Sequence, residues 1–299
     1  MSISEYLVSL MHQQQYQDYR LGDLKLLVRQ NTAEYFESHP EELETVSSNY
    51  ESLTGNSFAG NGNTIINGIA DHYAEKILGY TCTREEYFRL IESISFNQRD
   101  IDLIKETLQS KVPLIFGGHF AGNEILPVFI GNMFIPFSVF MRFKTDEGRK
   151  LIEQRLGGVM AETGMDIRLC EVDKGLTRDL VRIRKSRRVA YTVVDSFESW
   201  KVLEDSAETK VFGRDIRLDE VTAKIIEVLE ADVFWGTFIR DGLEGYRFTL
   251  KRIEPYREGG YVLPLMREWE NHILSYPDHY YGWQEVHELW DAGSVKQGK

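Results

Sequence analysis

The sequence predicts an α/β protein with a central, mostly parallel sheet flanked by helices and preceded by an N-terminal helical section. From about residue 98 onward, short apolar runs alternate with segments of helical periodicity, which is the pattern of a parallel sheet with crossover helices. Residues 1–97 are more polar and helical in pattern. The chain has 299 residues and shows no repeats and no low-complexity linker. We therefore expect a single domain, 1–299, with a helical section at 1–97 and an α/β core at 98–291.

Helix-start signals organise the N-terminal section. Ser38 precedes Pro40 and several acidic residues, as at the beginning of a helix. Thr83 and Glu86 have the spacing of a capping box, and an amphipathic segment follows them. Between these two signals, residues 58–68 are rich in Gly and Asn and are predicted to form a loop.

The core begins with a helix at 97–111 and a strand at 112–118. That strand, "VPLIFGG", is a short apolar run that ends in glycines, which is typical of a buried parallel strand. Further strands are expected at 135–143, 166–172, 189–195, 232–241 and 246–255. Further helices are expected at 123–131, 146–164, 176–188 and 218–231, and the segment 263–290 is expected to be helical around its proline.

Composition excludes several classes of protein. The net charge of −12 argues against a nucleic-acid partner, which selects for a basic surplus. Two distant cysteines, Cys82 and Cys170, are expected to be reduced, as in a cytoplasmic protein. No signal peptide is visible. The apolar stretch 125–143 is divided by Gly131–Asn132 and holds two prolines, which favours a helix followed by a strand over a membrane span. Peripheral contact with the inner membrane is left open.

The residue that most directly indicates a catalytic function is a histidine that follows the first predicted strand. Ligands of open α/β sheets bind at the carboxyl ends of the strands, where His119 stands. If a helix begins near His119, Glu124 falls near the same face and could orient the imidazole as a general base. Gly117 and Gly118 permit close backbone approach, and amides at a helix start could stabilise an oxyanion. The competing interpretation is a surface or packing pair.

Other catalytic signatures are absent from the sequence. No Gly-x-Ser-x-Gly turn offers a nucleophile, and no dinucleotide fingerprint or phosphate loop is present. His272, His279 and His287 are spaced by seven and eight residues, which is not a metal signature. We expect no metal and no resident cofactor, and direct transfer to an acceptor without a covalent enzyme intermediate.

The motif and its surroundings resemble a known family. His119-Phe-Ala-Gly-Asn-Glu124 is similar to the His-x4-Asp/Glu motif of glycerolipid-type acyltransferases, and most like the lipid A late acyltransferases (lauroyl and myristoyl transferases). In the same order, "FSVFMRF" ends in Arg142, "RRVAYTVVD" ends in Asp195, and "FWGTFIRDGLEGYRF" resembles an arginine and a Gly-Tyr-Arg hairpin. "PDHYYGWQEVHELW" resembles the closing segment. The likeness covers roughly residues 65 to 291.

This resemblance implies an acyltransferase that uses an acyl-carrier-protein or acyl-CoA thioester as donor and a hydroxyl or amine as acceptor. His119 would be the base and Glu124 its partner, and Arg142 would hold phosphopantetheine or a polar head group. The remaining substrate-binding positions that we carry over are Gly118, Asn123, Asp195 and Arg240. For Asp195 and Arg240, a structural ion pair or a strand cap is the alternative.

Two departures from the family pattern bear on the acceptor. The family usually has an N-terminal membrane-spanning helix, which this sequence does not show, and Glu285 and Glu288 stand where a basic tail is usual. We expect a cytoplasmic or peripheral relative whose acceptor is a sugar, a lipid, an amino compound or a natural-product intermediate.

A basic segment interrupts the acidic sequence, and its side chains could dock an acidic acyl carrier protein. The alternative is a solvated helix whose C-terminal cations favour its dipole. The residues predicted to dock the carrier are Arg182, Arg184, Lys185, Arg187 and Arg188.

Two further functions remain open at this point. One is a non-catalytic relative that binds an acyl carrier or a lipid, and thioester turnover would exclude it. The other is a thioester hydrolase with water as acceptor, which would consume thioester without an acylated product.

Overall fold

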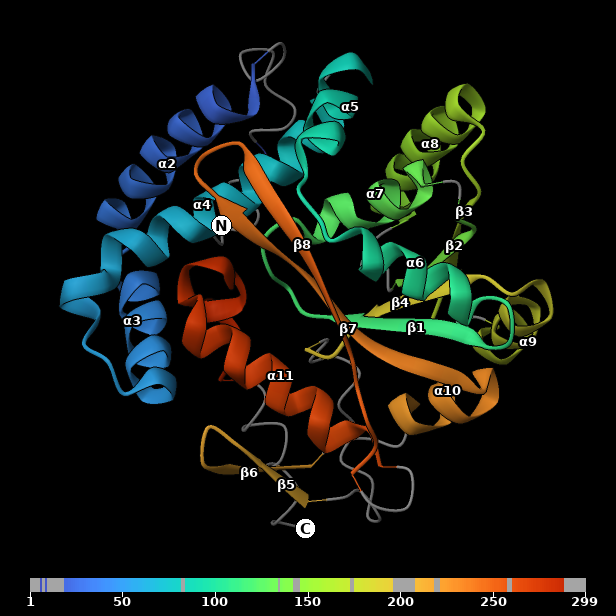
Figure 1. Ribbon diagram of the computed structural model, residues 1–299. Coiled ribbons are helices and arrows are strands. Elements are labelled where there is room, and N and C mark those ends of the chain that lie inside the picture. The colour runs from blue at the N-terminus through green and yellow to red at the C-terminus, as the bar shows by residue number, and fades with distance from the viewer. Residues whose placement is uncertain are drawn as a thin grey trace.

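The computed structural model describes residues 6, 9, 19–81, 84–133, 135–141, 146–172, 175–195, 208–217, 221–256 and 260–287. The predicted fold class is confirmed: a six-stranded, mostly parallel sheet is flanked by helices and preceded by helices at the N-terminus (Figure 1).

The sheet has the strand order β3-β2-β4-β1-β7-β8. All neighbouring pairs are parallel except β7 and β8, which form an antiparallel hairpin. Every residue of β1 is buried, as expected for the central strand of a sheet covered on both faces. The strands are β1 Val112–Gly117, β2 Phe137–Met141, β3 Ile167–Glu171, β4 Val189–Val193, β7 Ala231–Asp241 and β8 Gly245–Arg252.

Helices connect these strands as the periodicity predicted. Figure 1 shows α8 and α9 beside the β2–β3 side of the sheet, away from the N-terminal helices. The connecting elements are α6 Gln98–Thr107, η2 Asn123–Ile125, α7 Leu126–Asn132, α8 Asp146–Thr163, α9 Leu176–Ser186 and α10 Val221–Leu229. After β8 follow α11 Val262–Ser275, η4 Pro277–His279 and η5 Gly282–Gln284. A small hairpin that the sequence analysis did not predict consists of β5 Glu208–Val211 and β6 Arg214–Arg217.

The N-terminal section consists of α2 Leu21–Ser38, α3 Pro40–Thr54, α4 Phe58–Thr81 and α5 Arg84–Ser93. Pro40 is the first residue of α3, but His39 rather than Ser38 is its N-cap residue. The capping position Thr83 lies outside the described residues. In Figure 1, α2, α3 and α4 gather beyond the β7–β8 edge of the sheet.

The loop expected at 58–68 is wrong, because α4 begins at Phe58. Its residues Ile65 and Ile69 are fully buried, and this packing overrides the weak helix propensity of Gly and Asn. Gly68 serves packing rather than a turn. A Cβ atom there would lie 1.8 Å from the carbonyl oxygen of Asp278, so only glycine allows η4 to approach the helix this closely.

The apolar stretch 125–143 contains α7 and β2, as predicted. Among the described residues, no helix combines the length and the apolar character that crossing a membrane requires.

Candidate active site

The two central residues of the candidate site, His119 and Asp195, closely follow two adjacent parallel strands. β1 and β4 run side by side with Gly117 opposite Val193, and each chain continues for two residues past that point. His119 and Asp195 therefore arrive together at the carboxyl edge of the sheet, where α/β proteins bind their ligands. The register of the two strands produces the pair without a local sequence motif.

The Asp195 carboxylate is wholly buried and holds His119 at two points. Its Oδ1 lies 3.0 Å from Nδ1 of the imidazole, and its Oδ2 accepts the backbone N–H of His119 at 2.9 Å. The indole N–H of Trp269 donates to the same Oδ2 at 3.2 Å. This arrangement fixes both the carboxylate and the orientation of the ring.

The contact with Asp195 determines which imidazole nitrogen carries the proton. A carboxylate accepts, so Nδ1 carries hydrogen and Nε2 is left with its lone pair. No group among the described residues bonds to Nε2, and the His119 side chain is 30% exposed. Burial, the largest single effect, lowers the pKa of His119, but the charge and hydrogen bond of Asp195 and a smaller contribution from Glu124 together outweigh it, and the net pKa is raised. The ring is an oriented base of enhanced basicity.

Glu124 does not make the hydrogen bond expected of it. The chain does not enter a helix at His119; it first turns at Gly122, which has a left-handed φ of 70°, and α7 begins only at Leu126. The Glu124 carboxylate lies 3.9 Å from Nζ of Lys76, and both side chains are about 30% exposed. The partner predicted for the imidazole is thus corrected from Glu124 to Asp195.

The loop amides do not form the oxyanion site that the glycines suggested. Five successive backbone N–H groups, from residue 119 to residue 123, already donate to acceptors within the protein. These acceptors are the Asp195 carboxylate, Gly118 O, His279 O, the Glu75 carboxylate and Phe120 O. An oxyanion bound at this loop would need a donor other than these five amides.

The two glycines of the loop are required by protein contacts. A Cβ atom at Gly118 would lie 2.4 Å from the Phe120 ring, and one at Gly117 would lie 2.7 Å from the Tyr191 hydroxyl. Neither glycine has a positive φ. Gly118, predicted to bind substrate, here lets Phe120 fold back against the strand end.

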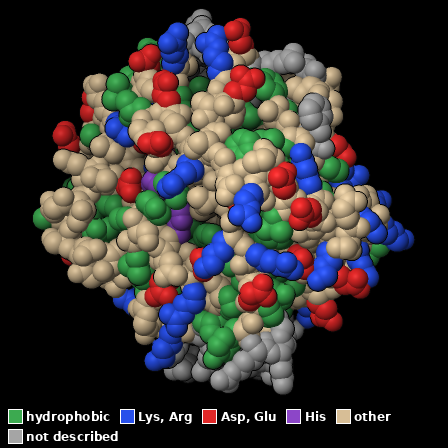
Figure 2. Space-filling view, in the orientation of Figure 1, with side chains coloured by type: hydrophobic (Ala, Val, Ile, Leu, Met, Phe, Trp, Pro, Cys, Tyr) green, Lys and Arg blue, Asp and Glu red, His purple; other side chains and the backbone are tan. Residues whose placement is uncertain are grey.

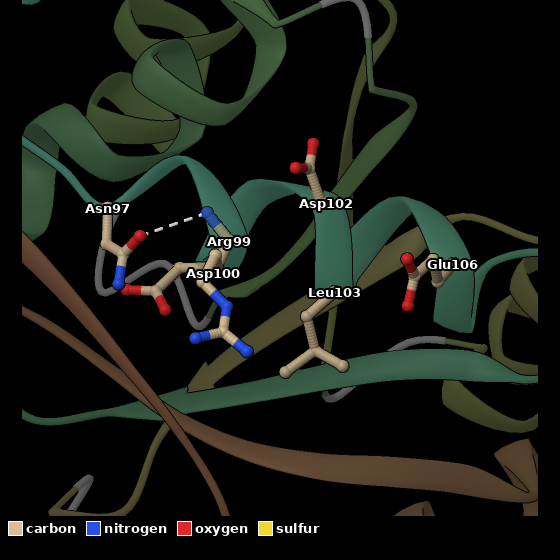
Figure 3. Close-up of a pocket in the computed structure, with 6 residues that line it drawn as sticks. All are labelled: Asn97, Arg99, Asp100, Asp102, Leu103 and Glu106. Carbon is tan, nitrogen blue, oxygen red and sulfur yellow. Dashed lines mark hydrogen bonds between the residues drawn. The ribbon is translucent and has the colours of Figure 1, made fainter.

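A small cavity adjoins this loop. Its polar lining includes Asn123, whose Oδ1 accepts a hydrogen bond from the Tyr191 hydroxyl. The other residues around it are Gly118, Phe120, Ala121, Leu126, Gly236, Thr237 and Phe238. A second, open hollow lies along α6 and shares no residue with the loop (Figure 3). The side chains drawn there are Asn97, Arg99, Asp100, Asp102, Leu103 and Glu106.

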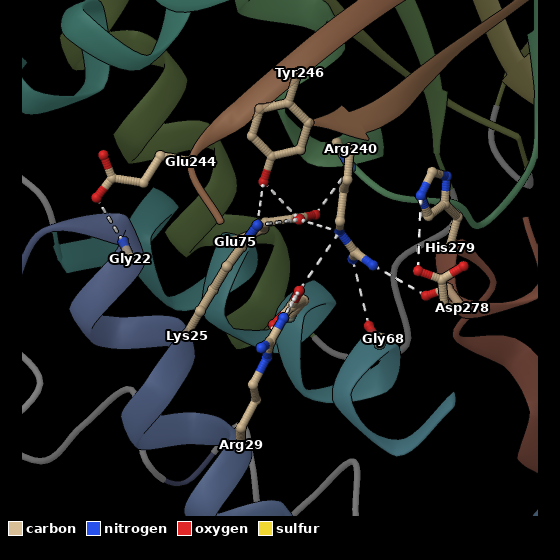
Figure 4. A network of polar contacts seen from close by, with 12 residues as sticks. Gly22, Lys25, Arg29, Gly68, Glu75, Arg240, Glu244, Tyr246, Asp278 and His279 are labelled. Carbon is tan, nitrogen blue, oxygen red and sulfur yellow. Dashed lines mark hydrogen bonds and ion pairs between the residues drawn. The ribbon is translucent and has the colours of Figure 1, made fainter. Parts of the chain in front are cut away.

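Arg240 belongs to a buried ion network rather than to a substrate site. Figure 4 shows Glu75 between Lys25, Arg240 and Tyr246. Oε1 of Glu75 lies 2.9 Å from Nε of Arg240, 3.3 Å from Nζ of Lys25 and 2.6 Å from the Tyr246 hydroxyl. Burial by itself raises the pKa of Glu75, but Arg240 and Lys25 outweigh it and keep the pKa far below its usual value. Of the two interpretations of Arg240, the structure shows the buried ion pair.

The same network anchors the candidate catalytic loop. Oε2 of Glu75 accepts the backbone N–H of Gly122 at 2.8 Å. A side chain at Gly122 would place its Cβ 2.8 Å from Phe238, so the turn is fixed from two sides. Glu75 was missed by the sequence analysis, because nothing in the helical pattern around it indicates a buried carboxylate.

Two further rings, those of Tyr281 and His72, pack near His119. The Tyr281 ring meets the imidazole edge-on, with 5.3 Å between centroids, and His72 stacks on Tyr281 at 3.3 Å. His72 is buried, and neither of its ring nitrogens has a hydrogen-bond partner. Burial lowers its pKa well below the ordinary value, and Lys76 adds to the shift. Tyr281 therefore separates His119 from a second, neutral histidine.

The predicted carrier-docking surface divides into two parts. Arg188 is buried and donates to Ser138 Oγ, to Phe137 O and to Asp166, so its exposed role is corrected to a structural one. The exposed remainder, the α9 basic cluster, consists of Arg182, Arg184, Lys185 and Arg187.

The α9 basic cluster lies at the wrong edge of the sheet for docking beside His119. α9 leads into the start of β4, whereas His119 follows the end of the parallel strand β1. Arg184 forms an ion pair with Glu230, which directly precedes β7, and Arg187 donates to the carbonyl oxygen of Gln109, which lies shortly before β1. Both partners are therefore at the edge of the sheet where these strands begin. In Figure 2, basic and acidic side chains intermingle over the side of this face that carries α9. The placement supports the solvated-helix alternative.

Two further predictions concern a site residue and metals. Arg142 lies outside the described residues. Among the residues that the structure describes, no three His, Cys, Asp or Glu side chains gather in a way that could hold a metal ion.

Comparison with known proteins adds no relative: no family model matches the chain, and no curated protein matches it.

Proposed function

We propose that this protein is an acyltransferase, which moves an acyl group from an acyl-carrier-protein or acyl-CoA thioester to a hydroxyl or amine. The observation that carries the proposal is the His119–Asp195 pair. Its Nδ1 is bonded to a buried carboxylate, and its Nε2 is partnerless and partly exposed at the carboxyl edge of the sheet. This is the arrangement of an oriented general base. The His-x4-Glu motif and the order of the flanking segments support the same conclusion.

The proposed reaction has two steps. Nε2 of His119 removes the proton from the acceptor O–H or N–H as the acceptor atom attacks the thioester carbonyl carbon, which forms a tetrahedral intermediate. The carbonyl then re-forms, the C–S bond breaks, and the imidazolium returns the proton to the leaving thiolate. Asp195 stabilises the imidazolium between the steps. The products are the acylated acceptor and a free thiol, so atoms and charges balance.

Direct transfer is favoured over a covalent acyl-enzyme. A serine or cysteine nucleophile would have to lie within hydrogen-bond reach of the base. No Ser or Cys side chain among the described residues bonds to the His119 ring, and the described cysteine, Cys170, is buried in β3 with a pKa raised by burial to about 11. The acceptor therefore attacks the thioester itself.

Acceptor classes consistent with the resemblance are a sugar, a lipid or a small amino compound, handled by a cytoplasmic or peripherally bound enzyme. If water takes the place of the acceptor, the same base activates it and the protein is a thioester hydrolase. Product analysis distinguishes the two.

The decisive experiment measures thiol release from a panel of acyl-CoA and acyl-carrier-protein donors, with hydroxyl and amine acceptors present. Wild type is compared with His119→Ala and with His287→Ala, an exposed histidine outside the site. Circular dichroism checks that each variant folds. We expect thiol release with an acylated product, lost in His119→Ala and retained in His287→Ala. Wild-type turnover in His119→Ala, or failure of every donor to bind the wild type, would overturn the proposal.

A further inference from the structure

The proposed transfer places a negative charge on the former carbonyl oxygen, and an enzyme needs a preorganised donor there. The backbone N–H groups of residues 119–123 are all engaged. A donor would therefore come from a side chain of the loop that carries His119.

Asn123 is held in one orientation by its neighbour. The hydroxyl of Tyr191 donates to Oδ1 of Asn123. Tyr191 stands on β4 opposite Ile115, and burial raises its pKa, with additional contributions from Asp195 and Glu124. The phenol therefore keeps its proton throughout the working pH range and remains a donor.

This contact leaves the amide group of Asn123 with two unused donors. With Oδ1 turned to Tyr191, Nδ2 points away from it, and no acceptor among the described residues bonds Nδ2. Asn123 is only partly buried. An oriented, partnerless NH₂ group is what an oxyanion requires, because its dipole is fixed before the charge develops.

A small cavity lies beside Asn123. Its lining is mainly apolar and includes Leu126 and Phe238, with Tyr191 and Thr237 also at its border. Gly118 and Phe120, the residues on both sides of His119, line it as well. The cavity has a volume of only about 10 Å³, room for one water molecule at most, so a thioester carbonyl would reach Asn123 from the partly exposed side of that residue.

We propose that Nδ2 of Asn123 donates a hydrogen bond to the thioester carbonyl oxygen and stabilises the oxyanion, with Tyr191 as the positioning residue that orients the amide. The inference rests on the proposed acyl transfer and deepens it: it assigns the group that acts on the carbonyl, as His119 acts on the acceptor.

The test compares single-turnover rates and donor affinity in Asn123→Ala, Asn123→Asp and Tyr191→Phe. Removal of one oxyanion donor lowers kcat by about 10²- to 10³-fold, so we expect a loss of that size in Asn123→Ala. The isosteric Asn123→Asp, which replaces the NH₂ group with a charged oxygen, should lose at least as much. Tyr191→Phe keeps the ring but frees the amide, and a loss of one hydrogen bond predicts about a tenfold decrease.

Two readouts separate this role from a structural one. Binding of a non-reactive thioether analogue of the donor should change less than threefold, because the hydrogen bond strengthens only in the transition state. Asn61→Ala, an exposed asparagine in α4, is the matched control and should keep the wild-type rate.

The outcomes distinguish this inference from the proposed function. If His119→Ala abolishes turnover while Asn123→Ala and Asn123→Asp both keep kcat within threefold, the function stands and the assignment of Asn123 is overturned. Parallel losses of kcat and analogue binding would also overturn it. If the wild type shows no histidine-dependent turnover, the proposed function fails and this inference falls with it.

Discussion

Replacing Asp195 with asparagine tests the central pair of the site with almost no change in shape. In the structure, Oδ2 accepts the backbone N–H of His119 and the indole N–H of Trp269, whereas Oδ1 faces Nδ1 of the imidazole. An asparagine whose oxygen keeps the Oδ2 contacts turns its NH₂ group toward Nδ1. The ring must then accept at Nδ1 and carry its proton on Nε2, where the base should be.

The size of the effect follows from this tautomer exchange. The equivalent change in a Ser-His-Asp triad lowers kcat by about 10⁴-fold, which corresponds to about 5 kcal/mol of transition-state stabilisation. We expect a loss of this order for Asp195→Asn. The pKa of His119 should also fall, because the carboxylate that raises it is gone and burial remains. The pH at which residual kcat/KM reaches half its maximum should therefore move down.

The assay is thiol release across pH 5 to 9, with Glu124→Gln as the comparison. Glu124 is partly exposed and is 3.9 Å from Lys76, so its amide variant should lose about tenfold or less. A loss in Glu124→Gln that equals or exceeds the loss in Asp195→Asn would refute the assignment of Asp195 as the orienting group. Near-equal thermal unfolding of the two variants excludes a folding artefact.

Three further predictions concern stability and surface charge. Glu75→Gln removes the carboxylate shared by the buried cations Lys25 and Arg240 and leaves Arg240 paired only with Asp71 at 4.0 Å. It should lower the free energy of unfolding by about 3–5 kcal/mol in urea titrations; a change below about 1 kcal/mol would contradict the network's role. Burial lowers the pKa of His272 and of His279 to about 3, so the unfolded chain binds more protons below about pH 6.5 and stability falls as pH falls. Each should cost about 2 kcal/mol at pH 5, and a double Gln variant whose unfolding keeps the wild-type pH dependence would rule this out. Neutralising the whole α9 basic cluster should change turnover with a carrier-protein donor less than twofold; a tenfold rise in KM would restore the docking interpretation.

Periodicity was sufficient to predict the fold because the central strands β1, β2 and β4 are mostly buried. The run "VPLIFG" is buried at every residue, and such a run between glycines and helical patterns admits few alternatives. The failure at residues 58–68 has the opposite cause. There local propensity favoured a loop, but buried isoleucines and the close approach of η4 to Gly68 stabilise a helix that propensity alone does not encode.

The candidate site was predicted in part, and its errors share one physical origin. Sequence spacing relates residues along one element, and it pointed from His119 to Glu124. The hydrogen-bond partner, Asp195, comes from a neighbouring strand 76 residues away. Strand order is not visible in the spacing of a single motif, and the family resemblance indicated Asp195 only as a substrate-binding position, not as the partner of the imidazole. Arg240 shows the converse error, because a resemblance identifies a position but not whether its guanidinium faces solvent or a buried carboxylate.

Through the ion network, the N-terminal helices hold the loop that carries His119 in place. Lys25 comes from α2 and Glu75 from α4, whereas Arg240 and Tyr246 come from the β7–β8 hairpin. Loss of Glu75 would leave Lys25 without its nearest carboxylate and Arg240 with Asp71 at 4.0 Å, and this costs stability because buried charges need close partners. Since the same carboxylate fixes the Gly122 amide, the geometry of the loop that carries His119 depends on Lys25 and Glu75, which lie in the N-terminal helices α2 and α4. We infer that a core expressed without residues 1–97 would lose the loop conformation as well as stability.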